Sequence, residues 1–97
     1  MNINMLMQKA QSLQKEMQKA QEEVGKMIFT SEQPLVKVEV NGKKEIVSIK
    51  IKEHIELDDL EMLEDMIMLA VNDAIRKATK EMEQRLSKYG QGLPGLF

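Results

Sequence analysis

The sequence has 97 residues, with 14 Lys or Arg, 16 Asp or Glu and a net charge of −2 at pH 7. A chain this short forms one domain, expected over residues 1–97, and leaves much apolar surface exposed as a monomer, so we expect a partner chain. Cysteine is absent, which excludes disulfides and thiolate metal sites, and the 42% hydrophobic and 31% charged residues disfavour disorder.

The beginning of the chain predicts a helix. Apolar residues recur at steps of three and four, and no Pro or Gly interrupts residues 2–24. This 3.5-residue period produces a narrow apolar seam, which is typical of helix-on-helix packing, so a second copy of the helix is a natural partner. The seam consists of Ile3, Leu6, Ala10, Leu13, Met17, Ala20 and Val24.

Two strands are predicted after this helix. Gly25 follows the last seam residue, at a place where the end of a helix often requires a positive φ. Residues 26–30 are rich in strand-forming side chains, and residues 35–40 alternate Val with charged residues. The intervening residues 31–34, Ser-Glu-Gln-Pro, predict a turn.

A second turn and a third strand follow. Asn41 and Gly42 both tolerate a positive φ and predict a two-residue type I′ turn. Residues 45–51 then return as a strand in which Val47, Ile49 and Ile51 alternate with polar side chains. The three strands predict an antiparallel meander with one lysine-rich, solvated face.

The last element is predicted to be a long helix. Asp58 with Glu61 three residues later is typical of a helix N-cap and capping box. A broad apolar stripe follows, wide enough to cover a sheet face. It consists of Leu60, Leu63, Met66, Ile67, Ala70, Val71, Ala74, Ile75 and Ala78, and then narrows to Met82, Leu86 and Tyr89. We expect this narrow end to project into solvent or against another chain.

The final segment, residues 90–97, is rich in Gly and Pro and is expected to be a flexible tail. It matches G-x-G-x-x-G at residues 90–95, which suggests dinucleotide binding. That motif requires a preceding strand and a following helix, whereas here a helix precedes it, so we do not expect a dinucleotide site.

Charge is unevenly distributed along the chain. Residues 53–75 carry eight carboxylates and no Lys or Arg, while residues 35–52 and 76–88 carry a net charge of +3 each. The basic segments could meet phosphate while the acidic segment faces elsewhere. No transmembrane segment or signal peptide is recognisable, so we expect a cytoplasmic protein that does not engage the membrane.

Nothing in the sequence predicts an enzyme. The serines lack a nucleophile motif, and His54, the single histidine, has no evident triad partner. A lone histidine among carboxylates also lacks the second nitrogen or sulfur ligand that transition metals require. We therefore expect no catalytic residues, no metal site and no cofactor.

The order of helix, meander and long helix, together with four sequence strings, resembles the YbaB/EbfC family of nucleoid-associated DNA-binding proteins. In this order and spacing the strings span nearly the whole chain. They are Met17-Gln18-Lys19-Ala20-Gln21-Glu22-Glu23, Val36-Lys37-Val38-Glu39-Val40-Asn41-Gly42, Glu61-Met62-Leu63-Glu64-Asp65 with Asn72-Asp73-Ala74, and Gly92-Leu93-Pro94-Gly95.

The resemblance implies an α+β homodimer shaped like tweezers that binds double-stranded DNA in the nucleoid with low sequence specificity. It carries over no base-reading residue, so site residues are predicted from charge and apolar pattern. The predicted phosphate contacts are Lys9, Lys15, Lys19, Arg76, Lys77, Lys80, Arg85 and Lys88. The predicted dimer contacts are Leu6, Leu13, Met17, Ile67, Val71 and Ile75.

An alternative function is a dimeric interaction module that recruits DNA-repair or replication proteins and binds little DNA itself. Methionine-rich faces adapt to several partners, so this function would depend on methionines rather than lysines. The methionines in question are Met62, Met66, Met68 and Met82.

Overall fold

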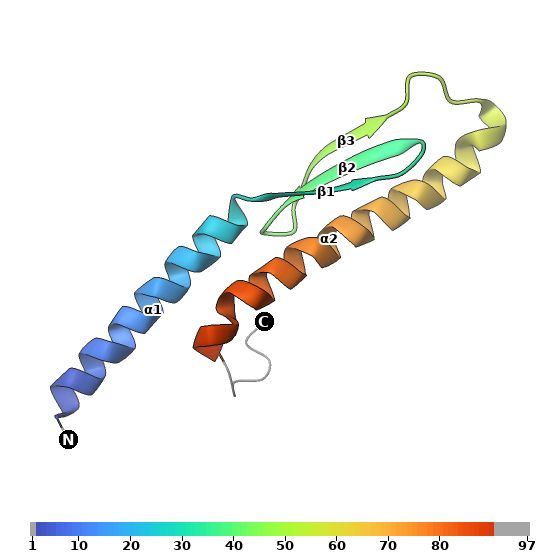
Figure 1. Cartoon of the computed structure of the whole chain (residues 1–97). Helices are drawn as coiled ribbons and strands as arrows, with labels where there is room; N and C mark the ends of the chain where they lie inside the picture. Colours follow the sequence, from blue (N-terminus) through green and yellow to red (C-terminus); the bar gives the residue numbers. More distant parts are fainter. Residues whose placement is uncertain (1, 91–97) are drawn as a thin grey trace.

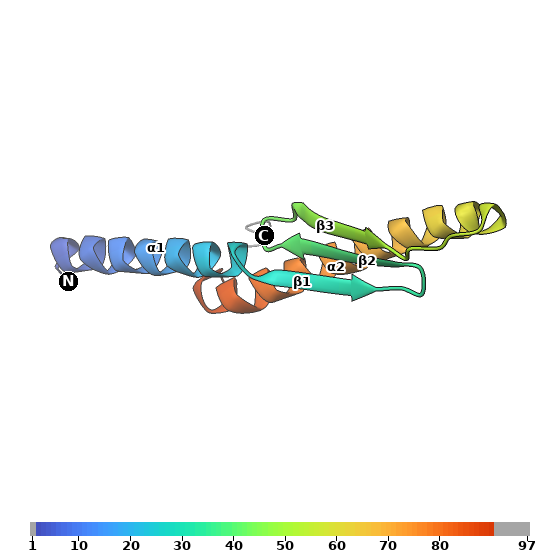
Figure 2. The ribbon, with the colours of Figure 1, turned by 90° about the horizontal axis from the view of Figure 1, so that it is seen from above.

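The computed structural model describes residues 2–90, so most of the predicted tail, residues 91–97, lies outside it. One long helix precedes a three-stranded sheet and another follows it, in an elongated molecule of 70 × 22 × 13 Å. One helix lies along a face of the sheet, and the other extends away from one end of it (Figures 1 and 2). The predicted α+β fold with this order of elements is confirmed.

Helix α1 (Ile3–Gly25) begins where the sequence predicts, because the side chain of Asn2 accepts a hydrogen bond from the backbone N–H of Asn4 at 3.0 Å. The prediction of a positive φ at Gly25 is wrong. Gly25 is the last helical residue, and the chain continues through Lys26 at a φ of −90°, so no left-handed residue is needed.

The sheet consists of β1 (Ile28–Glu32), β2 (Val36–Asn41) and β3 (Ile46–Ile51), in that order and antiparallel. The first strand lies two residues later than predicted. Ser31 and Glu32 belong to it rather than to the turn, because they pair with Val38 and Lys37.

The second hairpin differs from the predicted two-residue turn. The carbonyl of Asn41 accepts from the N–H of Lys44 at 3.0 Å, and its side-chain oxygen accepts from the N–H groups of Lys43 and Glu45. The positive φ falls on Lys44, at 67°, rather than on Asn41 or Gly42. The loop therefore has three residues closed by the Asn41 side chain, a common alternative hairpin.

A bulge shifts the apolar pattern of β3. Val40 pairs with Ile46 while Glu39 pairs with Ser48, so Val47 is the extra residue. Ile46 therefore takes the place predicted for Val47 on the same face as Ile49 and Ile51. This face is the one on which β2 carries its buried valines.

Helix α2 (Leu60–Gly90) follows a short 3₁₀ turn (Leu57–Asp59). The predicted N-cap at Asp58 is wrong, because Asp58 lies within this turn and the α-helix starts two residues later. The broad stripe packs on the sheet, where it covers β1 and β2. Its centre is made of fully buried alanines, which let the helix approach closely to the valines of β2. The contacting residues are Ala70, Ala74 and Ala78 with Val36, Val38 and Val40.

The end of α2 was predicted to project into solvent or against another chain, and this is wrong. It packs against α1 of the same chain, where Leu86 and Val24 are both buried. The guanidinium of Arg85 lies 3.8 Å from the carboxylate of Glu23 across this contact. Only the last third of the α1 seam is covered in this way, since Ile3, Leu6 and Leu13 are exposed.

Gly42 connects the hairpin to α1. Its N–H donates to the carbonyl of Gly25 at 3.2 Å, and a Cβ at position 42 would overlap the carbonyl group of Val24. A Cβ at position 25 would instead meet only the flexible side chain of Lys43, at 3.4 Å. Glycine at position 42 is thus required by close approach and not by backbone conformation.

Gly42→Ala should therefore lower the free energy of unfolding by about 1–3 kcal/mol, because the added methyl group forces two backbone segments apart. Gly25→Ala is the matched control and should be tolerated. Urea unfolding of both variants measures the difference. Equal stabilities of the two variants would contradict the assignment of the close approach to Gly42.

A partly buried polar contact links β1 to α2. The hydroxyl of Ser31, 2% exposed, donates to the carboxylate of Asp73 at 2.8 Å. This hydrogen bond, assisted by the nearby charges of Lys77 and Arg76, holds the pKa of Asp73 below its usual value. A carboxyl group with a lowered folded-state pKa stabilises the fold above its unfolded pKa, and this contribution disappears as pH falls through the folded pKa.

Ser31→Ala should accordingly lower the thermal midpoint at pH 7 by more than at a pH below the folded-state pKa of Asp73, where this carboxyl group is protonated in both states. The pKa of Asp73, followed by NMR titration, should rise toward its usual value in the variant. Thr30→Ala serves as the control, since the Thr30 side chain faces away from Asp73. If Ser31→Ala lowers the thermal midpoint by the same amount at both pH values, the Ser31–Asp73 hydrogen bond does not stabilise the fold in this way.

Candidate nucleic-acid interface

The predicted basic residues of α1 lie on a helix that extends beyond the sheet (Figure 1). Lys9, Lys15 and Lys19 are all exposed. Lys15 and Lys19 are one turn apart and share a face, whereas Lys9 lies on a different side of the helix. The structure therefore brings two of the three together on one surface.

The predicted basic residues of α2 separate into two groups. Lys77 donates to the carbonyl of Thr30 at 2.8 Å and lies 3.4 Å from Asp73, so it ties α2 to β1. Arg85 pairs with Glu81 at 3.1 Å and also faces Glu23 of α1. These two cations already have partners within the fold.

Arg76 and Lys80 form the second group. They are exposed, one helical turn apart, and neither forms an ion pair with any residue in the range 2–90. Their positive charge is therefore directed to solvent. A surface of this kind suits a phosphate backbone, which requires cations at the surface but no fixed geometry.

Lys19, Arg85 and Lys88 converge from the two helices. They line a shallow hollow of about 220 Å³ between α1 and the end of α2. The carboxylates of Glu16 and Glu23 line the same hollow, so its charge is mixed. The ammonium of Lys88 lies 4.9 Å from the centre of the Tyr89 ring, a cation–π contact that restrains it.

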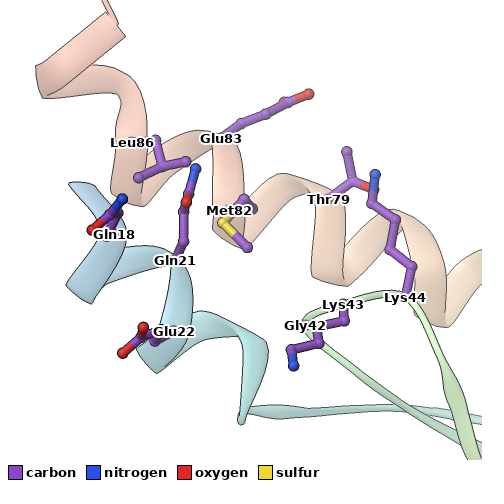
Figure 3. Close-up of a pocket in the computed structure, with 10 residues that line it drawn as sticks. All are labelled: Gln18, Gln21, Glu22, Gly42, Lys43, Lys44, Thr79, Met82, Glu83 and Leu86. Carbon is purple, nitrogen blue, oxygen red and sulfur yellow. The ribbon is translucent and has the colours of Figure 1, made fainter. Parts of the chain in front are cut away.

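Two lysines outside the predicted set also lie between the helices. Lys43 and Lys44 line a larger hollow, of about 620 Å³, where α1, the hairpin and α2 meet (Figure 3). In sequence they stand far from the other basic clusters. Only the packing of the hairpin on the end of α1 brings them between the helices, and the sequence carries no signal for it.

The predicted dimer contacts also differ in environment. Leu6 and Leu13 are exposed on α1, and Met17 is half-buried. Ile67, Val71 and Ile75 are half-buried and pack against the core of their own chain.

A further apolar surface lies on β3. α2 packs on β1 and β2, which leaves Ile46, Ile49 and Ile51 about half exposed on the helix side of the sheet. Asp73 and Lys77 of α2 face β1, so Val71 and Ile75 on the other flank of the helix lie toward β3. We call this surface, made of Ile46, Ile49, Ile51, Val71 and Ile75, the β3 overhang.

Within the described residues, neither helix is long and apolar enough to cross a membrane. No group of three His, Cys, Asp or Glu side chains in the range 2–90 is arranged to hold a metal ion.

Comparison with known proteins identifies the family. A sequence model of the YbaB/EbfC DNA-binding family matches residues 1–93. A protein named "Nucleoid-associated protein" from Chloroflexus aurantiacus is 44% identical over 100% of this chain and 100% of its own length. A protein of the same name from Legionella pneumophila is 37% identical over 95% of this chain and 84% of its own length. A nucleoid-associated protein of Lactococcus lactis is 44% identical over 97% of this chain and 98% of its own length. The resemblance seen in the sequence is confirmed, and the chain belongs to the YbaB/EbfC DNA-binding family.

Proposed function

We propose that this protein acts in the nucleoid as a homodimer that binds double-stranded DNA through backbone phosphates, with low sequence specificity. The observation that carries this proposal is the pair of exposed cations on α2, Arg76 and Lys80, which form no ion pair among residues 2–90. Family membership and the names of the relatives support DNA as the ligand.

The acidic net charge does not oppose this proposal, because the charges are separated in space. The acidic residues 53–65 lie in the loop and the first turns of α2, at the end of the molecule opposite to α1 (Figure 1). Asp65, the last carboxylate of this run, lies 11 residues before Arg76 on α2, which is about 16 Å of helix and about twice the Debye length of about 8 Å at physiological salt. DNA bound at the basic surfaces is therefore repelled only weakly by the acidic end.

Low specificity is supported by the kind of side chain available. Base readout requires side chains placed in a groove with fixed geometry, and phosphate contacts require only positive charge. Long basic side chains on two exposed helix surfaces favour phosphate contacts over base readout. No Phe or Tyr in the predicted contact set is available as a wedge between bases, so strong kinking is not expected.

Homodimerisation is supported by the β3 overhang. Its three isoleucines are 44–49% exposed on an edge strand, next to the half-buried flank of α2. An apolar patch of this kind on a short chain is typical of an interface. A second copy is the simplest occupant, since a two-fold axis through the overhang would cover the same patch on both chains.

The double variant Arg76→Gln/Lys80→Gln should weaken binding similarly for unrelated duplexes. The slope of log K against log salt should decrease in magnitude by about 0.9 for each phosphate that the variant no longer neutralises. Fluorescence anisotropy between about 50 and 200 mM salt measures both quantities. The control is Lys37→Gln/Lys50→Gln, which removes the same charge from the outer face of the sheet. If both double variants weaken DNA binding equally, the result contradicts a binding site on α2.

Ile49→Lys should raise the dimer dissociation constant by at least about 30-fold, since it places a charge in the centre of the overhang. Sedimentation equilibrium measures the change. Ser48→Lys, on the opposite face of the same strand, is the control and should leave the dimer intact. A dimer that survives Ile49→Lys would exclude the overhang and favour the predicted α1 contacts Leu6, Leu13 and Met17.

The second candidate, an interaction module that recruits DNA-repair or replication proteins, is favoured by one observation. Met62 and Met68 are 51% and 60% exposed, although Met66 and Met82 are half-buried. A protein partner held by these methionines should stay bound at high salt, whereas phosphate-mediated binding should disappear.

A further inference from the structure

The hollow lined by Lys43 and Lys44 has donors from three separate elements. Gln18 and Gln21 of α1 and Thr79 of α2 line it with the two lysines of the hairpin. Figure 3 shows the Gln21 side chain directed from α1 toward α2, across the space between the helices. We call this the junction hollow.

Lys44 occupies a backbone conformation that disfavours its residue type. Its φ of 67° is in the left-handed region, which Gly or Asn adopts at lower cost than Lys. Its side chain extends from the hairpin toward α2 (Figure 3), and Thr79 of α2 lines the same hollow. A long cationic side chain is thus present where a turn alone would favour glycine.

Lys43 approaches the other side of the hollow. Its Cγ and Cε lie 3.4 and 3.5 Å from the position of a Cβ on Gly25, so its stem crosses the end of α1. Glu22 and Glu83 are the two carboxylates at the rim, and Figure 3 shows both directed away from the centre. The lining therefore has two lysines and two carboxylates, and the carboxylates are the groups directed outward.

We propose that the junction hollow binds a phosphodiester group of the DNA backbone, with Lys43 and Lys44 as its cations and Gln21 and Thr79 as neutral donors. This inference rests on the proposed DNA binding. Ammonium, amide and hydroxyl groups are the side-chain donors that commonly contact phosphate oxygens. The hollow lies where α1, the hairpin and α2 meet, so a phosphate bound there would contact all three elements.

The test compares Lys43→Gln/Lys44→Gln with the outer-face control Lys37→Gln/Lys50→Gln in the full-length protein. Anisotropy with a random duplex should show an affinity loss of at least about tenfold for the first double only, and a salt slope reduced in magnitude by about 1.8. Unchanged affinity, or equal weakening by both doubles, would overturn the proposal. Absence of binding by the unmodified protein at low salt would instead refute the proposed function.

Lys44→Gly separates a binding role from a structural one. Glycine relieves the left-handed conformation and removes the ammonium, so the thermal midpoint should not fall while DNA affinity does. An affinity loss accompanied by a lower midpoint would indicate a structural role and overturn the proposal.

Inorganic pyrophosphate distinguishes DNA from a small phosphate compound. If the junction hollow binds DNA phosphate, pyrophosphate should displace the duplex only at millimolar concentration. If micromolar pyrophosphate shifts the Lys44 side-chain NMR signals while Lys43→Gln/Lys44→Gln binds DNA normally, the hollow takes free phosphate compounds and the proposal fails.

Discussion

The packing of three alanines of α2 on three valines of β2 determines the position of every other part of this molecule. Alanine side chains let the helix axis lie close to the sheet, and the i, i+4 spacing of Ala70, Ala74 and Ala78 matches the alternation of the valines along the strand. A helix this close can cover only about two strands. It covers β1 and β2, and β3 consequently keeps an exposed apolar face.

The same packing decides which cations are available for a ligand. Once the alanines face β2, Asp73 and Lys77 must face β1, where Ser31 and the carbonyl of Thr30 bind them. Arg76 and Lys80 then point to solvent. Residues that are neighbours in one basic cluster of the sequence therefore have different surroundings, because successive residues of a helix point in different directions.

The sequence allowed the helices and strands to be predicted because they depend on hydrophobic period, which is local. It was less informative about turns, where side chains compete for the same backbone groups. Asn41 closes a three-residue loop with its own oxygen, and Ser31 continues β1 by pairing with Val38 while its hydroxyl bonds to Asp73, 42 residues later. The site was predictable only as a set of cations. The partners of Lys77 and Arg85, and the place of Lys44 between the helices, depend on the packing of distant segments.

Gly42 also helps to fix the direction in which α1 leaves the sheet. α1 continues for 23 residues from the point where this glycine touches it, which is about 35 Å of rigid helix. At that length a rotation of about 10° at the glycine would move the free end of the helix by about 6 Å, roughly one helical pitch. The position of Lys9 relative to the sheet therefore depends on the backbone contact of Gly42 at the other end of α1.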